Sequence, residues 1–311
     1  MKWLTVVFFL FAAASCAGTA GNTPPGKIKP PAEPPQVNGS VRLTFERTLG
    51  MPGEIRSPWG ISFGVDGSLY VCDRGKSSIV RLNSEGTIIS RFDSFTNRTE
   101  RLYAPIDVCS SSGIEVYAVD AADSRVLRFD RNLKNGFTIY RGGADENRLF
   151  GSFNGLAYDK ISGDLFITDR DTGAVIRIDM LGGSIRTLGA FGSERTSLKM
   201  PSGLDVDQDG VLYIADTGNR AITVVKNFGA KITYIGQEIL DAPVDAAVLP
   251  GGNIAVADRS GVIILSPSGI AEAFAGFGVE RTMAPRSVAF NGGRLYVSDS
   301  ASSSILVYRV E

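Results

Sequence analysis

The stretch PSGLDVDQDGVLYIAD at positions 201–216 contains a leading Pro, a short apolar run, a Gly-bearing turn and a second apolar run that ends in Asp. A third apolar run follows at 221–225. The same order of features occurs six times between positions 58 and 308, with 14 to 16 residues from the opening residue to the Asp. Such self-similarity is typical of a solenoid, an array or a propeller.

The copies share an opening residue, a terminal Asp and a fourth strand-like run. The opening residues are Pro58, Pro105, Phe153, Pro201, Pro243 and Pro285. The terminal residues are Asp73, Asp120, Asp169, Asp216, Asp258 and Asp299. The fourth runs lie at 87–92, 137–140, 184–188, 231–235 and 270–274. Four short strands in units of 41 to 49 residues, counted from Asp to Asp, predict the blades of an all-β propeller.

The sixth copy has no fourth run before the last residue, Glu311. An unmatched strand-like run at 41–49 precedes the first copy. We expect it to form the outer strand of the last blade and close the ring, because an open array exposes unpaired strand edges. The predicted fold is therefore a six-bladed β-propeller with four-stranded antiparallel blades, closed by an N-terminal strand.

The fourth copy resembles the NHL repeat in its elements PSGL at 201–204, YIAD at 213–216 and GNR at 218–220. The other five copies are looser versions of it. The resemblance covers 41–311 and implies a six-bladed propeller. WD-type repeats are disfavoured, because they use a Gly-His element and this sequence has no His.

The composition is that of a folded, β-rich protein. Of 311 residues, 43% are hydrophobic, 21% are charged and 36 are Gly. The formal net charge of -1 argues against a large electrostatic interaction with nucleic acid. We therefore expect no nucleic-acid partner.

The N-terminus resembles a bacterial lipoprotein signal. Lys2 precedes an apolar run at 3–14, and small residues at 13–15 precede Cys16. The resemblance implies that Cys16 is lipidated and anchors the protein to a lipid bilayer in the cell envelope, outside the cytoplasm. An ordinary cleaved signal is the alternative. The predicted domains are a signal peptide at 1–15, a lipidated Cys and Pro-rich tether at 16–40, and a propeller at 41–311.

The six terminal Asp residues are predicted to be structural. Sixfold-related carboxylates would lie far apart around a ring rather than converge on a metal. A short carboxylate after a strand is well suited to accept backbone N–H bonds from the turn that follows it.

Cys72 and Cys109 fall in neighbouring repeats. An oxidising compartment permits a disulfide between them. Two buried free thiols are the alternative.

Strand alternation predicts which end of the propeller binds ligands. If the first strand leaves the opening residue and the second returns to the Asp, both ends lie on one rim, which the charged interblade loops also reach. We expect this rim to be the binding face. Its candidate binding residues are Trp59, Arg101, Arg148, Asn154, Arg195, Arg281 and Arg286.

The absence of His weighs against several kinds of enzyme. It removes His-based triads and His metal ligands, including the zinc chemistry that NHL-type lyases use. Gluconolactonase-type propellers bind a divalent metal through acidic and Asn side chains, and Asn154 is similar to that family's Asn. Ser202 and Arg56 stand where the resemblance implies acidic ligands, so the metal set is incomplete.

The sequence therefore favours a non-catalytic binding or scaffold module, with no catalytic residue, metal or cofactor. Its expected partner is an envelope or secreted protein, and binding of a small ligand stays open. Two alternatives also stay open. One is a metal-dependent hydrolase or lactonase of the gluconolactonase type, and the other is a carbohydrate- or peptidoglycan-binding module that uses Trp59 and Tyr103.

Overall fold

The computed structural model describes residues 35–50, 53–93, 100–143, 151–189, 198–229, 231–276 and 283–311. The chain divides into two compact units, 1–32 and 33–311, and every described residue belongs to the second. The predicted signal peptide, Cys16 and residues 17–34 therefore lie outside the described residues, as do Arg148, Arg195 and Arg281. No helix in the described ranges is long and apolar enough to cross a bilayer.

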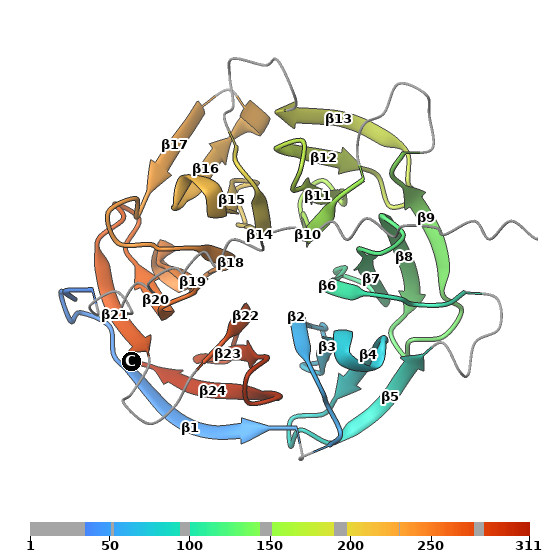
Figure 1. The fold of residues 1–311 in the computed structure, drawn as a ribbon, viewed down its shortest axis with the longest axis horizontal. Helices are drawn as coiled ribbons and strands as arrows, with labels where there is room; N and C mark the ends of the chain where they lie inside the picture. Colours follow the sequence, from blue (N-terminus) through green and yellow to red (C-terminus); the bar gives the residue numbers. More distant parts are fainter. Residues whose placement is uncertain are drawn as a thin grey trace, which may run out of the picture. The chain divides into compact units, whose positions relative to one another are not determined.

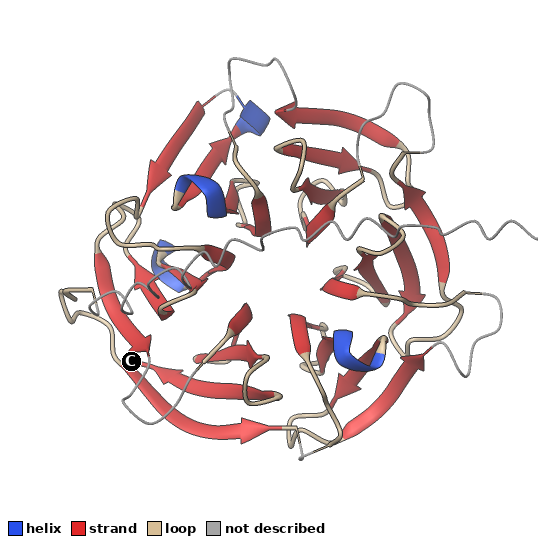
Figure 2. Cartoon of the chain, viewed as in Figure 1, coloured by secondary structure: helices blue, strands red, loops and turns tan. Residues whose placement is uncertain are grey.

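Six four-stranded antiparallel sheets are arranged as blades around a common axis (Figure 1). Strands make up nearly all of the regular structure, with only short helical turns between them (Figure 2). The predicted six-bladed propeller is confirmed.

The strands follow the repeat. Blade 1 contains β2 (Pro58–Phe63), β3 (Leu69–Asp73), β4 (Ser78–Leu82) and β5 (Ile88–Asp93), and blade 2 contains β6 (Pro105–Ser110), β7 (Glu115–Asp120), β8 (Arg125–Asp130) and β9 (Phe137–Arg141). Blade 3 contains β10 (Phe153–Tyr158), β11 (Leu165–Asp169), β12 (Ala174–Ile178) and β13 (Ser184–Gly189), and blade 4 contains β14 (Pro201–Val206), β15 (Leu212–Asp216), β16 (Ala221–Lys226) and β17 (Lys231–Ile235). Blade 5 contains β18 (Pro243–Val248), β19 (Ile254–Asp258), β20 (Gly261–Leu265) and β21 (Ala271–Gly276), and blade 6 contains β22 (Pro285–Asn291), β23 (Arg294–Asp299), β24 (Ser304–Val310) and β1 (Leu43–Leu49). The 3-10 turns are η1 (Arg74–Lys76), η2 (Thr217–Asn219), η3 (Asn227–Gly229) and η4 (Pro250–Gly252).

The N-terminal strand completes the last blade, as the sequence predicts. β1 pairs antiparallel with β24, in a sheet of order β1-β24-β23-β22. The segment before β1 also contacts blade 5, because the N–H groups of Asn38 and Gly39 donate to the carbonyl oxygens of Ala271 (2.8 Å) and Glu272 (3.1 Å). The last residues assigned to the tether therefore lie on the propeller and bridge blades 5 and 6.

The hydrophobic core lies between the blades. One cluster joins Tyr70 of blade 1 to Phe129 of blade 2, and another joins Val71 of blade 1 to Val307 of blade 6. Each blade therefore buries its apolar faces only when both neighbours are present.

Cys72 and Cys109 are buried and free, so the disulfide that the sequence left open is not formed in this structure. They belong to different interblade clusters. Burial raises the pKa of both thiols well above the ordinary value, so both stay protonated at neutral pH.

The opening residue and the terminal Asp of each repeat are register partners. The pairs are Pro58 with Asp73, Pro105 with Asp120, Phe153 with Asp169, Pro201 with Asp216, Pro243 with Asp258 and Pro285 with Asp299. The prediction that both lie on one rim is thereby confirmed.

Removal of residues 1–49 should abolish the cooperative thermal unfolding of the propeller, because β24 loses its partner strand and blade 6 its outer strand. Removal of residues 1–34 is the matched control, since it keeps β1, and should leave the melting temperature unchanged. Circular dichroism during heating measures both. Equal transitions in the two truncated proteins would contradict the role of β1 in closure.

Candidate functional site

The six terminal Asp side chains are fully buried beneath the rim. Each accepts at least one backbone N–H bond from the segment just before the opening residue of its own blade. The donors are Arg56 and Ser57 for Asp73, Tyr103 and Ala104 for Asp120, Gly151 and Ser152 for Asp169, Lys199 for Asp216, Asp241 and Ala242 for Asp258, and Ala284 for Asp299.

These bonds differ in part from the expected ones. The sequence predicted bonds to the turn that follows the Asp, and such bonds are made by Asp169, Asp216, Asp258 and Asp299. The bonds to the preceding segment are common to all six, because the chain enters the first strand directly above the end of the second. The Asp thus fixes the entry of the interblade loop into each blade.

Replacement of Asp258 by Ala should lower the free energy of unfolding by about 2–4 kcal/mol, because it leaves the N–H groups of Asp241, Ala242 and Ser260 without an acceptor. Asp241→Ala is a matched control, because the Asp241 side chain makes only partly exposed ion pairs with Arg220 and Arg259. Urea unfolding compares the two variants. Equal losses in both would contradict the structural role of Asp258.

A second ring of residues lines the centre of the propeller, two positions after each opening residue. It consists of Gly60, Asp107, Gly155, Gly203, Asp245 and Ser287. Three of its side chains join neighbouring blades by accepting backbone N–H bonds. Asp107 accepts from Leu156 (2.7 Å), Asp245 from Val288 (3.0 Å) and Ser287 from Ile61 (3.2 Å).

Two of the glycines make room for these carboxylates. A Cβ on Gly60 would overlap Asp107, and one on Gly203 would overlap Asp245. Each Asp therefore fills the space that the preceding blade leaves empty. The sequence shows Asp in this position but does not reveal its interblade bonds.

Asp107 and Asp245 belong to blades 2 and 5, which lie opposite each other in the ring of six. Burial raises the pKa of Asp107 well above its ordinary value, and the negative charge of Asp245 adds to the rise. Burial also raises the pKa of Asp245, to about 7. The two carboxyls thus interact across the channel, and one of them titrates near neutral pH.

The raised pKa of Asp245 makes stability depend on pH. The folded protein holds a proton here that the unfolded chain, with a pKa near 3.8, releases. The stabilisation that this proton contributes is fully present below the pKa of Asp245 in the unfolded chain, and it is lost as pH rises through about 7. Asp245→Asn should remove up to about 2.5 kcal/mol of the stability difference between pH 5 and pH 8. Melting temperatures at both pH values measure this, and an identical pH dependence in the variant would disprove it.

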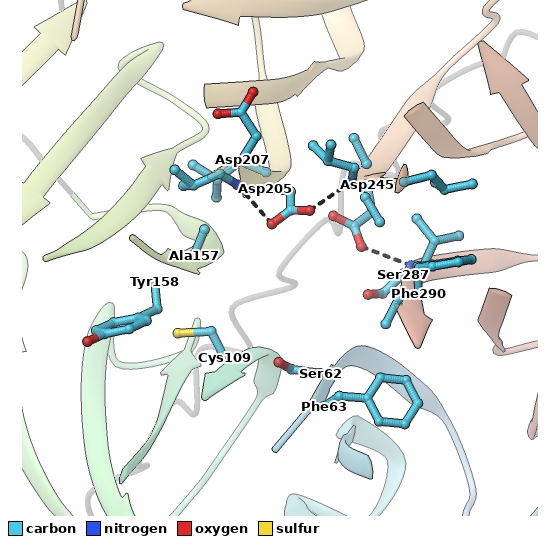
Figure 3. Close-up of a pocket in the computed structure, with 18 of the residues that line it drawn as sticks. Ser62, Phe63, Cys109, Ala157, Tyr158, Asp205, Asp207, Asp245, Ser287 and Phe290 are labelled. Carbon is cyan, nitrogen blue, oxygen red and sulfur yellow. Dashed lines mark hydrogen bonds between the residues drawn. The ribbon is translucent and has the colours of Figure 1, made fainter. Parts of the chain in front are cut away.

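Two cavities meet at Asp107 and Asp245, which line both of them. The first, the rim cavity, has about 420 Å³ and opens on the rim that the sequence predicted as the binding face. The second has about 730 Å³ and opens at the other end of the first strands. Figure 3 shows the second cavity, into which Asp205 and Asp245 project from β14 and β18.

The rim cavity collects three of the predicted binding residues, Trp59, Asn154 and Arg286. Arg101 does not line it. Arg170 and Arg259, which the sequence analysis missed, line it as well. Each directly follows a terminal Asp, so their position in the repeat could have identified them.

Two guanidinium groups pack on the ring of Trp59. The Cζ atoms of Arg74 and Arg286 lie 4.4 Å and 4.7 Å from its centroid. Burial lowers the pKa of Arg286, and the positive charge of Arg74 lowers it further. The Nε of Arg286 donates to the Oγ of Ser300 (3.0 Å). The mouth of the cavity therefore carries concentrated positive charge.

The side chains at this mouth do not fit a divalent metal. The Nδ2 of Asn154 donates to the Oγ of Ser202 (2.8 Å), where a gluconolactonase-type site would have an acidic ligand. No cluster of three or more His, Cys, Asp or Glu with metal-binding geometry occurs in the described part of the chain. Arg170 and Arg286 would in addition repel a cation at this mouth.

The sequence model of the NHL repeat matches residues 198–225. No curated protein matches the sequence. Among solved structures, the chain is similar to virginiamycin B lyase from Staphylococcus aureus (14% identity, TM-score 0.63, 86% of this chain and 99% of that one). It is also similar to a gluconolactonase from Xanthomonas campestris (14% identity, TM-score 0.63, 87% of this chain and 98% of that one). A third similar structure is a PQQ-bound aldose sugar dehydrogenase from Streptomyces coelicolor (17% identity, TM-score 0.61, 89% of this chain and 100% of that one).

These comparisons overturn the expectation of a non-catalytic scaffold. That expectation rested on the idea that propellers of this type more often bind proteins, whereas the similar structures are a lyase, a lactonase and a dehydrogenase. Likeness at such low identity shows the fold alone. The chemistry of this chain therefore depends on the residues of its own channel.

Proposed function

This chain is a six-bladed β-propeller of the NHL-repeat family, and from the chemistry of its channel we propose that it is an enzyme that hydrolyses small lactones. The observation that carries the proposal is the pair of buried carboxyls, Asp107 and Asp245, where the two cavities meet. Two carboxyls with differently raised pKa values supply an acid and a base at neutral pH.

The pKa values assign the two roles. Asp245, with a pKa of about 7, is the base and removes a proton from water as the water oxygen attacks the lactone carbonyl carbon. Asp107, whose pKa is raised well above its ordinary value by burial and by the charge of Asp245, is the acid that gives a proton to the ring oxygen as the C–O bond breaks. The product is a hydroxy acid, and a proton then passes through solvent from Asp245 to Asp107, which restores both carboxyls. Lactone and water are thereby converted to the hydroxy acid.

Cations lie at the entrance to the cavity. Arg286 and the other cations of the rim cavity lie on the side from which a substrate enters. Their positive charge draws a polar or anionic substrate into the cavity from its mouth, away from the carboxyls that act on the carbonyl. The resemblance to a solved gluconolactonase supports a lactone as the substrate class.

Hydrolysis does not depend on His in this proposal. A solved virginiamycin B lyase that is similar to this chain is described as catalytically inactive after a His-to-Ala change. This sequence contains no His, so its acid and base must be other groups. Carboxyls in a low-dielectric channel meet that requirement.

Asp245→Asn and Asp107→Asn should each lower kcat/KM for a sugar γ-lactone by at least about 100-fold, because each removes one proton-transfer group. In the unaltered protein, kcat/KM should rise as pH increases through about 7, where Asp245 becomes ionised. EDTA should leave the rate unchanged. Release of acid, followed with a pH indicator, measures these rates.

Asp205→Asn is the matched control. Asp205 is a half-buried channel carboxylate, which accepts from the N–H of Val248 (2.8 Å), but it lines only the larger cavity. Its replacement should change kcat/KM by no more than a few-fold. The proposal fails if the unaltered protein opens no lactone, or if correctly folded Asp245→Asn protein keeps full activity.

A further inference from the structure

The arginines in the described part of the chain differ in whether a carboxylate balances their charge. Nine arginines there form ion pairs with a carboxylate: Arg81, Arg125, Arg128, Arg141, Arg177, Arg220, Arg259, Arg294 and Arg309. Within the same described ranges, Arg74, Arg170 and Arg286 form none. Two of these line the cavity, and the third packs on its Trp59.

Arg286 is held in position without an ion pair, although the charge of the buried Asp299 acts on it favourably. Its guanidinium packs on Trp59 and donates through Nε to Ser300, which leaves Nη1 and Nη2 without a protein acceptor in the described structure. Arg74 lies on the same ring, so the two cations repel each other. Positive charge concentrated in this way around one ring favours the binding of an anion nearby.

Arg170 and Arg259 belong to the walls contributed by blades 3 and 5. Arg259 is largely exposed and lies 3.5 Å from Asp241, so its charge is partly balanced. Arg170 is exposed and follows Asp169, whose own carboxylate is occupied by backbone N–H groups. Positive charge therefore comes from several sides of the mouth, while the carboxyls lie at its base.

We propose that the rim cavity binds a carboxylate of the substrate on Arg286 and Arg74, at the end opposite the reacting carbonyl. The inference rests on the proposed function for the reaction. It identifies the substrate as the lactone of a sugar diacid, which keeps one free carboxylate, rather than an uncharged sugar lactone. A planar guanidinium binds a carboxylate through two parallel hydrogen bonds, which suits the free Nη1 and Nη2 of Arg286.

The size and polarity of the cavity agree with such a ligand. About 420 Å³ is in the range of small-molecule sites. The hydrogen-bonded pair of Asn154 and Ser202 also lines the cavity and offers polar groups to sugar hydroxyls. The carboxylate at the mouth and the carbonyl near Asp245 thus define one orientation of the substrate.

Binding of D-glucarate, measured by titration calorimetry, tests the site without requiring turnover. The unaltered protein should bind D-glucarate and D-gluconate, each of which offers a carboxylate to the arginines, and should bind uncharged D-glucitol or inorganic phosphate least. Arg286→Gln and Arg74→Gln should each weaken D-glucarate binding by about 10- to 100-fold, as expected for loss of a charged hydrogen bond. Arg42→Gln, at an exposed arginine next to the outer strand β1, should bind as the unaltered protein does.

Kinetics give a second measurement. Arg286→Gln should raise KM about 10-fold or more for D-glucarate γ-lactone but not for a neutral sugar γ-lactone. Equal binding of D-glucarate and D-glucitol would overturn the inference, as would tighter binding of inorganic phosphate or unchanged affinity in both arginine variants. Arginine-dependent binding in a protein that opens no lactone would support the anion site and reject only the proposed hydrolysis.

Discussion

Antiparallel pairing of β1 with β24 joins the first and last described strands of the propeller in one sheet. No blade has a core of its own, because the apolar clusters lie between adjacent blades. The ring must therefore close before any blade is covered on both faces. The residues that precede β1 extend this closure by hydrogen bonds to β21 of blade 5.

Closure also determines where the chemistry can occur. It places six inner strands around one channel, and every residue two positions after an opening residue then faces the same narrow space. Carboxyls at two of these positions are deprived of water and lie in opposite blades, which raises their pKa values. The same residues stabilise the ring by accepting N–H bonds from the next blade. Structure and proposed catalysis thus use the same two side chains.

The two carboxylate rings show why equivalent residues in a repeat can differ in role. The terminal Asp residues lie farther from the axis and are occupied by backbone N–H groups of the loops. Asp107 and Asp245 interrupt a ring that otherwise contains Gly or Ser. Departure from the repeat, rather than the repeat itself, therefore indicates the candidate site. The position after the terminal Asp also varies between blades. It is Arg in three of them, at Arg74, Arg170 and Arg259, and these arginines lie at or near the rim cavity.

The sequence by itself determined the number of blades, the strand that closes the ring and the rim shared by the Pro and Asp ends, because these follow from the repeat period and strand alternation. It also placed Trp59, Asn154 and Arg286 on that rim. Only the tertiary structure decided that Asp107 and Asp245 face each other, that two guanidiniums pack on Trp59, and that Arg101 lies apart from the cavity. These relations join residues from different blades, whose distances and burial depend on how the ring closes rather than on any local pattern.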